Sequence, residues 1–126
     1  MKVTKVFEFD SAHNLINYNG KCEKLHGHTY KLEVTVSGVP DINGLVIDFT
    51  LLKSIVNECI IEKLDHQYLN ELFDFNTTCE NILVWMWNQL YGRLKTDRFE
   101  LYQLTLWETP TSYATVTKED MGDVES

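Results

Sequence analysis

Three of the four histidines in the chain stand near its N-terminal end, at positions 13, 26 and 28. His26 and His28 form an H-x-H pair, and residues two apart on a β-strand point to the same face. Zinc favours imidazole nitrogen, and a catalytic zinc site commonly has three protein ligands and an open fourth position. The spacing therefore predicts a zinc site made by His13, His26 and His28. An H-x-H pair alone is a weak signal, and histidines satisfied within the core are its alternative.

Cys22 lies four residues before His26, in a loop that also carries Lys21 and Lys24. A thiol near cations or a metal has its thiolate form favoured, which makes Cys22 a candidate base or nucleophile. Two other roles stay open. Cys22 could be an exposed bystander, or a fourth ligand that closes a purely structural metal site.

Two carboxylates complete the set of candidate reactive groups. Asp65 directly precedes His66, and the pair is either a turn and capping feature or part of a proton relay with Cys22. Glu108 ends an expected strand on the parity of Tyr102, Leu104 and Leu106, so we predict that it points to the buried face. A carboxylate there needs a partner, which could be Lys, Arg or a ligand with N–H donors.

The elements that must position these residues follow the order β, β, β, α, α, β, β. The first helix carries Cys59 on its apolar stripe, where a thiol packs as a small hydrophobe. The second begins at a capping-box pattern of Thr77 and Glu80 and is expected to reach about Lys95. The expected strands cover residues 3–9, 26–37, 45–49, 99–108 and 112–117, and the first helix covers residues 50–63. This order predicts one α+β domain over residues 1–118, an antiparallel sheet with helices on one face, and a frayed acidic tail over 119–126.

Composition limits the function classes. The 126 residues carry a net charge of −8, which disfavours nucleic acid and anionic membranes as partners. No apolar run approaches the roughly 20 residues of a membrane span, and the first residues do not form a signal peptide. The three cysteines form no C-x-x-C pair, which suits a reducing compartment. We therefore expect a cytoplasmic protein.

Five motifs, in order, are typical of one family. They are SAH around His13, C-x-x-x-H-G-H from Cys22 to His28, LDH at 64–66, T-x-E-N from Thr78, and WETPTS at 107–112. Together they span about residues 5–117 and make the chain resemble the 6-pyruvoyltetrahydropterin synthase family. Within that family the chain is most similar to the bacterial 6-carboxytetrahydropterin synthase branch of the queuosine pathway.

The resemblance implies a T-fold, in which a four-stranded antiparallel sheet carries two helices on one face. Subunits of such proteins join their sheets into trimeric barrels, and two trimers stack into a homohexamer. It also implies zinc bound by His13, His26 and His28, with Cys22 as base and Asp65 and His66 as the relay, usually from a neighbouring subunit. Glu108 would anchor the pterin ring, beside a pocket wall formed by Thr78 and Cys79.

The implied substrate is 7,8-dihydroneopterin triphosphate, converted to 6-carboxy-5,6,7,8-tetrahydropterin with release of acetaldehyde and triphosphate. The alternatives are the pyruvoyl branch, which eliminates triphosphate only, and a non-catalytic zinc-stabilised pterin-binding module. A triphosphate requires local cations, for which Lys21 and Lys24 are the candidates. Two residues depart from the family pattern. Thr77 stands where many bacterial members have Pro, and Glu23 is next to Cys22, where some relatives use Glu in place of the thiol.

Overall fold

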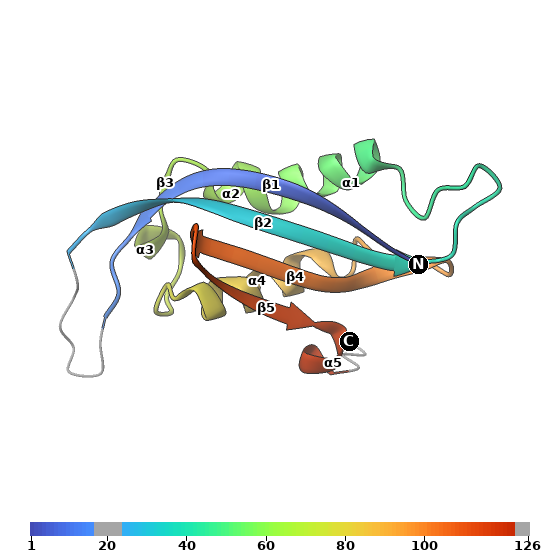
Figure 1. Ribbon diagram of the computed structural model, residues 1–126. Helices are drawn as coiled ribbons and strands as arrows, with labels where there is room; N and C mark the ends of the chain where they lie inside the picture. Colours follow the sequence, from blue (N-terminus) through green and yellow to red (C-terminus); the bar gives the residue numbers. More distant parts are fainter. Residues whose placement is uncertain (17–23, 123–126) are drawn as a thin grey trace.

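The computed structural model describes residues 1–16 and 24–122, and at its centre lies a five-stranded sheet in the order β3-β1-β2-β4-β5 (Figure 1). Four long strands pair antiparallel with their neighbours: β1 (Lys2–His13), β2 (His26–Gly38), β4 (Phe99–Thr109) and β5 (Ser112–Thr117). The short β3 (Gln67–Tyr68) runs parallel to the end of β1. The predicted α+β class and four-stranded antiparallel sheet are therefore confirmed, with β3 as an unforeseen parallel edge strand.

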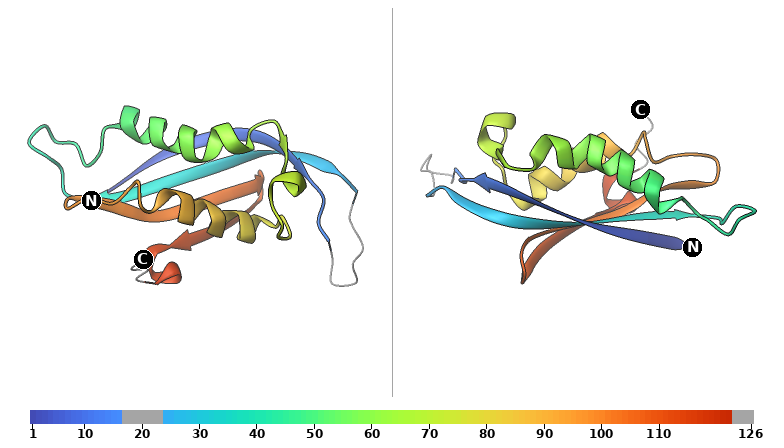
Figure 2. Two further views of the ribbon diagram at one scale, coloured as in Figure 1. Left: turned by 180° about the vertical axis from the view of Figure 1, so that it is seen from behind. Right: turned by 90° about the horizontal axis from the view of Figure 1, so that it is seen from above.

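The helices lie on one face of this sheet, as the two views of Figure 2 show. The first helical run is continuous from residue 49 to 64 and contains a π-helical segment in its middle. The helical elements are α1 (Phe49–Val56), η1 (Asn57–Ile61), α2 (Glu62–Leu64), α3 (Leu69–Leu72), α4 (Cys79–Leu90) and α5 (Lys118–Met121). Among the described residues, no helix is both long and apolar enough to cross a bilayer.

The hydrophobic core fills the space between the sheet and these helices. On β2 the side chains that face the helices alternate with polar ones, as expected for a strand with one buried face. Tyr30, Leu32, Val34 and Val36 are fully buried, whereas Thr29 is exposed. Cys59 is buried in the same core, as its place on the apolar stripe predicted. Because His26 and His28 continue the buried parity of β2, both point to the helix-covered side.

The first strand is longer than expected, and this matters for the site. The sequence predicts a strand over residues 3–9 followed by a loop, but β1 continues to His13. The pairing of β1 with β2 then places His13 directly opposite His26. The third histidine is thus held by the same sheet as the other two.

The predicted strand over residues 45–49 is wrong. Val46 and Ile47 are buried, but they lie in a connecting segment that leads to Asp48, whose side chain caps α1 by accepting from Thr50 N at 2.8 Å. Arg98 Nη1 donates to the backbone oxygens of Leu45 and Val46 in this segment, and to that of Val39, at 2.7–3.0 Å. The carbonyls of the segment thus bond to a side chain rather than to a neighbouring strand. A single guanidinium therefore satisfies polar groups that a sheet would otherwise pair.

Three further boundaries differ from the prediction. The cap of α4 is Thr78 and not Thr77, since the Thr78 hydroxyl accepts from Asn81 N at 3.1 Å. The same helix ends at Leu90, short of Lys95. At the other end of the chain, residues 119–121 of the expected frayed tail belong to α5, whose start is fixed by a reciprocal cap between Thr117 and Asp120.

A bulge interrupts the parity of β4. The register against β2 shifts between Thr35 and Val36, so that Leu101 and Leu104 are both fully buried although they are three residues apart. Tyr102 therefore does not share the face of Leu104, and its ring instead lies 4.0 Å from Lys2 Nζ. Glu108 lies at a second irregularity, between Trp107 and Thr109 in the pairing of β4 with β5, so its direction is established by its contacts and not by alternation.

Candidate functional site

Three imidazoles converge where β1 ends and β2 begins. His13 packs against both residues of the H-x-H pair, with ring centroids 4.8 Å from His26 and 5.1 Å from His28, while His26 and His28 are 4.7 Å apart. Their ligand nitrogens all lie within 4.8 Å of one another. The sheet register produces this convergence, because His13 faces His26 across the strand pair and His28 follows on the same side.

Backbone carbonyls orient two of the three rings. His13 Nδ1 donates to the carbonyl oxygen of Thr77 at 2.8 Å, and His26 Nδ1 donates to the carbonyl oxygen of Lys24 at 2.9 Å. A carbonyl can only accept, so each of these bonds fixes the ring proton on Nδ1. The Nε2 lone pair of each neutral ring is then available to a metal, which is how metal-binding histidines are commonly prepared.

The buried nitrogens of the cluster fit a metal ion. Nε2 of His13 and Nε2 of His28 are buried and have no hydrogen-bond partner among the described residues. Burial lowers the pKa of His28, Glu108 opposes this, and the neighbouring imidazoles of His13 and His26 lower it further. A lowered pKa keeps the imidazole neutral at neutral pH, which is the form that binds metal. The donor set of three neutral nitrogens suits zinc.

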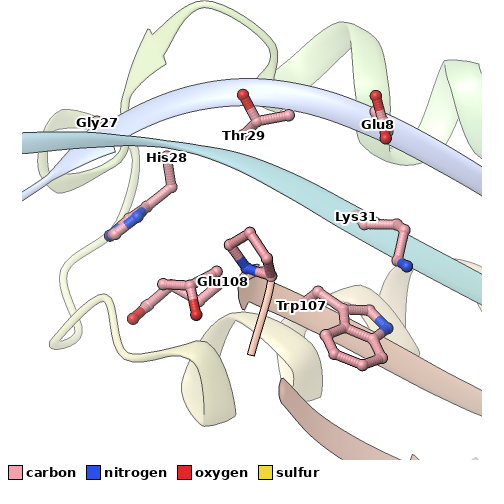
Figure 3. A pocket seen from close by; sticks show the side chains of 9 residues that line it. Glu8, Gly27, His28, Thr29, Lys31, Trp107 and Glu108 are labelled. Carbon is pink, nitrogen blue, oxygen red and sulfur yellow. The ribbon is translucent and has the colours of Figure 1, made fainter. Parts of the chain in front are cut away.

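Glu108 borders the cluster from β4. Its Oε2 lies 3.8 Å from His13 Nε2, and its side chain is only 26% exposed. No Lys or Arg of the described chain forms an ion pair with it. Glu108 and His28 lie toward one end of a hollow of about 510 Å³, with Lys31 and Trp107 toward the other (Figure 3). The predicted inward orientation of Glu108 is confirmed.

The N-terminus of α4 forms the neighbouring wall. Thr77 is fully buried and its carbonyl holds His13, while Thr78 caps the helix. Cys79 Sγ donates to the carbonyl oxygen of Leu106 at 3.2 Å. Burial, followed by the charge of Glu108, raises the pKa of Cys79 to about 11. Cys79 is therefore a neutral thiol at neutral pH, which suits a pocket wall and not a nucleophile.

Asp65 and His66 form a close pair beside the end of β1. His66 Nδ1 lies 3.1 Å from Asp65 Oδ2, and Asp65 Oδ1 accepts from the backbone N–H of Asp10 at 2.9 Å. That backbone bond, supported by His66, lowers the pKa of Asp65, so the carboxylate is ionised at neutral pH. His66 has a left-handed backbone with φ of 58°, which is uncommon for a residue with a side chain. Its backbone N–H donates to Asp10 O at 2.6 Å, which holds this conformation.

Asp65 and His66 lie on a different side of the sheet from the three-histidine cluster. Asp10 has the parity of the open face, where its carboxylate accepts from Thr29 Oγ1 at 2.5 Å. Its Oδ atoms, those of Asp65 and a ring nitrogen of His66 form a second group within 4.8 Å. His66 and His28 border one hollow of about 520 Å³, but the His28 ring points to the helix-covered face.

The described residues do not include the predicted thiol, and they leave the predicted cation Lys24 at the surface. Cys22, with its neighbours Lys21 and Glu23, lies outside the described residues. Lys24 is described, and its side chain is exposed while its carbonyl orients His26. Lys31, which the sequence analysis did not single out, is the cation bordering the hollow beside Glu108, with Nζ 4.5 Å from the Trp107 ring centroid.

Sequence reasoning also missed the groups that act through the backbone. Residue types alone do not indicate that the carbonyl of Thr77 orients His13 or that the carbonyl of Lys24 orients His26. Tyr30 was missed as well, although its parity was visible: it follows His26 and His28 at the same two-residue spacing, and its ring contacts those of His13 and His28. Burial raises the pKa of Tyr30, and Glu108 and Cys79 raise it further.

Known proteins are similar to this chain in sequence and in architecture. The family model for 6-pyruvoyl tetrahydropterin synthase matches residues 2–119. The chain is 38% identical to the 6-carboxy-5,6,7,8-tetrahydropterin synthase of Haemophilus influenzae, over 89% of this chain and 95% of the relative. It is also 38% identical to the 6-pyruvoyl tetrahydrobiopterin synthase of Dictyostelium discoideum, over 75% of this chain and 71% of the relative.

A solved structure agrees with the sequence matches. The 6-pyruvoyl tetrahydropterin synthase of Caenorhabditis elegans superimposes with a TM-score of 0.80, at 27% identity, over 93% of this chain and 94% of that one. The T-fold expected from the motifs is thereby confirmed. The cluster of His13, His26 and His28 is consistent with a metal site typical of such proteins. The chain belongs to the 6-pyruvoyl tetrahydropterin synthase family.

Proposed function

We propose that this pterin synthase is a zinc-dependent 6-carboxytetrahydropterin synthase. It would convert 7,8-dihydroneopterin triphosphate to 6-carboxy-5,6,7,8-tetrahydropterin, releasing acetaldehyde and triphosphate. The observation that carries the proposal is the convergence of three oriented imidazoles beside a carboxylate that has no Lys or Arg partner in the described chain. The choice of the carboxy branch is supported by the Haemophilus influenzae relative, which matches more of the chain than the Dictyostelium discoideum relative at equal identity.

His13, His26 and His28 would hold the zinc through neutral imidazole nitrogens. When bound, the ion supplies Lewis acidity that polarises the oxygens of the substrate side chain and acidifies neighbouring protons. The carbonyls of Thr77 and Lys24 keep two of the rings in the tautomer that this requires. Burial of His13, which is fully enclosed, shields the centre from water on that side.

Glu108 would anchor the pterin ring. Its carboxylate can only accept hydrogen bonds when ionised, and a pterin presents an amino group and an adjacent ring N–H on one edge. Two parallel bonds from that edge to one carboxylate fix the ring in its plane as well as binding it. Thr78 and Cys79 are proposed to line the pocket from the start of α4, and the neutral thiol of Cys79 adds no competing charge.

Proton transfer is assigned to Cys22, Asp65 and His66. We propose Cys22 as the base that removes a side-chain proton, an assignment that rests on the family motif. Asp65 fixes the His66 ring through Nδ1 and leaves Nε2 to exchange a proton with the substrate. The exposed position of His66, whose side chain is 77% accessible, is consistent with a group that meets a substrate.

The placement of the relay favours a site shared between subunits. His66 lies with Asp10 on the open face, whereas the three metal-binding histidines of the same chain face the helices. The sheet also ends in strands with unpaired backbone on both sides, an arrangement that invites pairing with another copy. We therefore propose a homo-oligomer, a trimer or hexamer, in which one subunit supplies Asp65 and His66 to the zinc centre of its neighbour.

The test is product analysis. Purified protein loaded with zinc is incubated with 7,8-dihydroneopterin triphosphate, and the pterin products, acetaldehyde and triphosphate are quantified together. We expect acetaldehyde and 6-carboxytetrahydropterin in equal amounts. Triphosphate with a 6-pyruvoyl product and no acetaldehyde would assign the chain to the pyruvoyl alternative. Pterin binding without any product would show a non-catalytic zinc-stabilised module.

A further inference from the structure

Three buried polar atoms have no hydrogen-bond partner among the described residues, and their side chains touch one another. They are Nε2 of His13, Nε2 of His28 and the hydroxyl of Tyr30. The Tyr30 ring packs edge-on against both imidazoles, with centroids 6.3 Å from His13 and 5.6 Å from His28. A metal ion would satisfy the two nitrogens. The hydroxyl of Tyr30 would still need an acceptor.

The backbone and a stacked ring hold Tyr30 in place. Its ring is stacked on Phe9, its partner across β1 and β2, with centroids 5.1 Å apart and planes within 10°. On its other side, Lys31 pairs with Trp107. Glu108 follows Trp107 directly, at an irregularity in the pairing of β4 with β5. Glu108 and Cys79 are close enough to act electrostatically on the hydroxyl. The hydroxyl therefore lies near Glu108 and Cys79, two of the residues assigned to the pterin pocket.

An unpaired hydroxyl in this position lowers the stability of the metal-free protein. Tyr30 is fully buried, so its hydroxyl has lost its bonds to bulk water. Burying a hydroxyl without a partner is unfavourable, whereas a phenylalanine ring could keep the stacking on Phe9 without that penalty. A polar group that costs stability in this way is expected where a bound ligand provides the missing partner.

We propose that the Tyr30 hydroxyl donates a hydrogen bond to an acceptor atom of the pterin bound at the centre, which makes Tyr30 a positioning residue for the substrate. The inference rests on the proposed function and adds to it. A pterin presents ring nitrogens and a carbonyl oxygen as acceptors besides its N–H donors. Glu108 can bond only to the N–H donors of the pterin, since a carboxylate only accepts hydrogen bonds. Tyr30 supplies the complementary donor, so that the two residues together select the ring orientation.

The test removes the hydroxyl and keeps the ring. Tyr30→Phe is compared with Tyr91→Phe, a matched control whose hydroxyl lies at the opposite end of the sheet and donates to Glu100 at 3.4 Å. For each protein we would measure zinc content, the unfolding midpoint without metal, the Kd of neopterin by fluorescence, and the KM and kcat for 7,8-dihydroneopterin triphosphate. Neopterin serves as the binding probe because it has the ring and side chain but no leaving triphosphate.

We expect Tyr30→Phe to keep wild-type zinc content, to unfold about 3 °C higher without metal, and to bind neopterin roughly five- to tenfold more weakly. The loss should appear in KM more than in kcat if the bond is present in the ground state. Tyr91→Phe should show neither the gain in midpoint nor the loss of affinity. A purely structural tyrosine would not combine higher stability with weaker binding.

Several results would overturn the inference. Unchanged neopterin affinity in Tyr30→Phe would show that the hydroxyl does not meet the ligand, and loss of zinc would show that it serves the metal instead. If the affinity penalty disappears in a Glu108→Gln background, Tyr30 acts by holding Glu108 and does not contact the pterin. A wild-type protein that binds no pterin refutes the proposed function itself, and this result is distinct from the others because it requires no variant.

Discussion

Removal of the His13 ring should destabilise the metal-free protein far more than removal of the His26 ring, although both rings are assigned to the same metal. His13 is fully buried, and its Nδ1 bond reaches the carbonyl of the fully buried Thr77. His13→Ala leaves that carbonyl unpaired, at a cost of about 1–3 kcal/mol. It also leaves a cavity, which adds roughly 1–2 kcal/mol. We expect a total loss of about 3 kcal/mol.

His26→Ala removes a ring with a different environment. His26 is only partly buried, and its bond to the carbonyl of Lys24 is exposed to solvent. Water can replace the lost donor, so the expected cost is about 0.5 kcal/mol, the usual size for a change near the surface. For a domain of this size, 1 kcal/mol corresponds to about 3–5 °C in the unfolding midpoint. The two variants should therefore differ by roughly 10 °C.

The assay is thermal unfolding after exhaustive chelation, followed by the same measurement with excess zinc. Zinc should raise the midpoint of the wild-type protein, because a ligand that binds only the folded state stabilises it. Both variants should respond weakly, and elemental analysis should find them depleted in zinc. His66→Asn is the control: it removes the fourth histidine, and Asn tolerates the left-handed backbone that His66 adopts. This variant should keep both its zinc and its midpoint.

Two outcomes would refute this reasoning. Equal destabilisation of metal-free His13→Ala and His26→Ala would show that the Thr77 contact does not distinguish the rings. Full zinc content in either variant would show that the ion does not need all three imidazoles.

Three further predictions concern the groups around the centre. Cys22→Ala should keep its zinc and its fold, but its rate of product formation should fall by about 100-fold or more, as for the loss of a general base. An unchanged product yield, measured by mass spectrometry, would show that the base is wrongly assigned. Glu108→Gln should keep its zinc and bind neopterin roughly 10- to 100-fold more weakly, since hydrogen bonds to a charged acceptor are lost. Unchanged neopterin affinity in a fluorescence titration would contradict the assignment of Glu108 as the anchor of the pterin ring. Cys79, with its pKa raised to about 11 from an ordinary 9.0, should be about 100-fold less thiolate at pH 8 than an ordinary thiol. Its alkylation, followed by peptide mass spectrometry, should therefore accelerate steadily up to pH 11, and a rate that levels off near pH 9 would contradict the shift.

The alternation of β2 was sufficient to predict the face of the H-x-H pair. Because side chains on a strand alternate strictly, the apolar residues at 30, 32, 34 and 36 fixed the side on which His26 and His28 lie. The same reasoning could not place His13, since the apolar pattern of the first strand fades before it. Its position depends on a pairing register, Ala12 with Gly27 and His13 with His26, that is a tertiary property of the sheet.

The segment before α1 shows why a short apolar run is ambiguous. Val46 and Ile47 are as buried as strand residues, so composition alone favours a strand. What decides the outcome is where the backbone carbonyls find donors, and here Arg98, more than fifty residues away, provides them. Likewise Thr77 and Thr78 are chemically equivalent caps in the sequence. Thr77 is drawn into the core by the bond between its carbonyl and His13, which leaves the cap to Thr78.

The bond between Thr77 and His13 links the proposed metal site to the proposed ligand pocket. The peptide that orients His13 is immediately followed by the cap of α4 and then by Cys79, whose thiol is tied to the strand that carries Glu108. We therefore expect a shift of the His13 ring to move the wall of the proposed pterin pocket, because Thr78 and Cys79 follow Thr77 directly. A metal ion bound at Nε2 would hold the His13 ring from its other nitrogen. We expect this to make the start of α4 more rigid and so to set the proposed pocket in place before the substrate arrives.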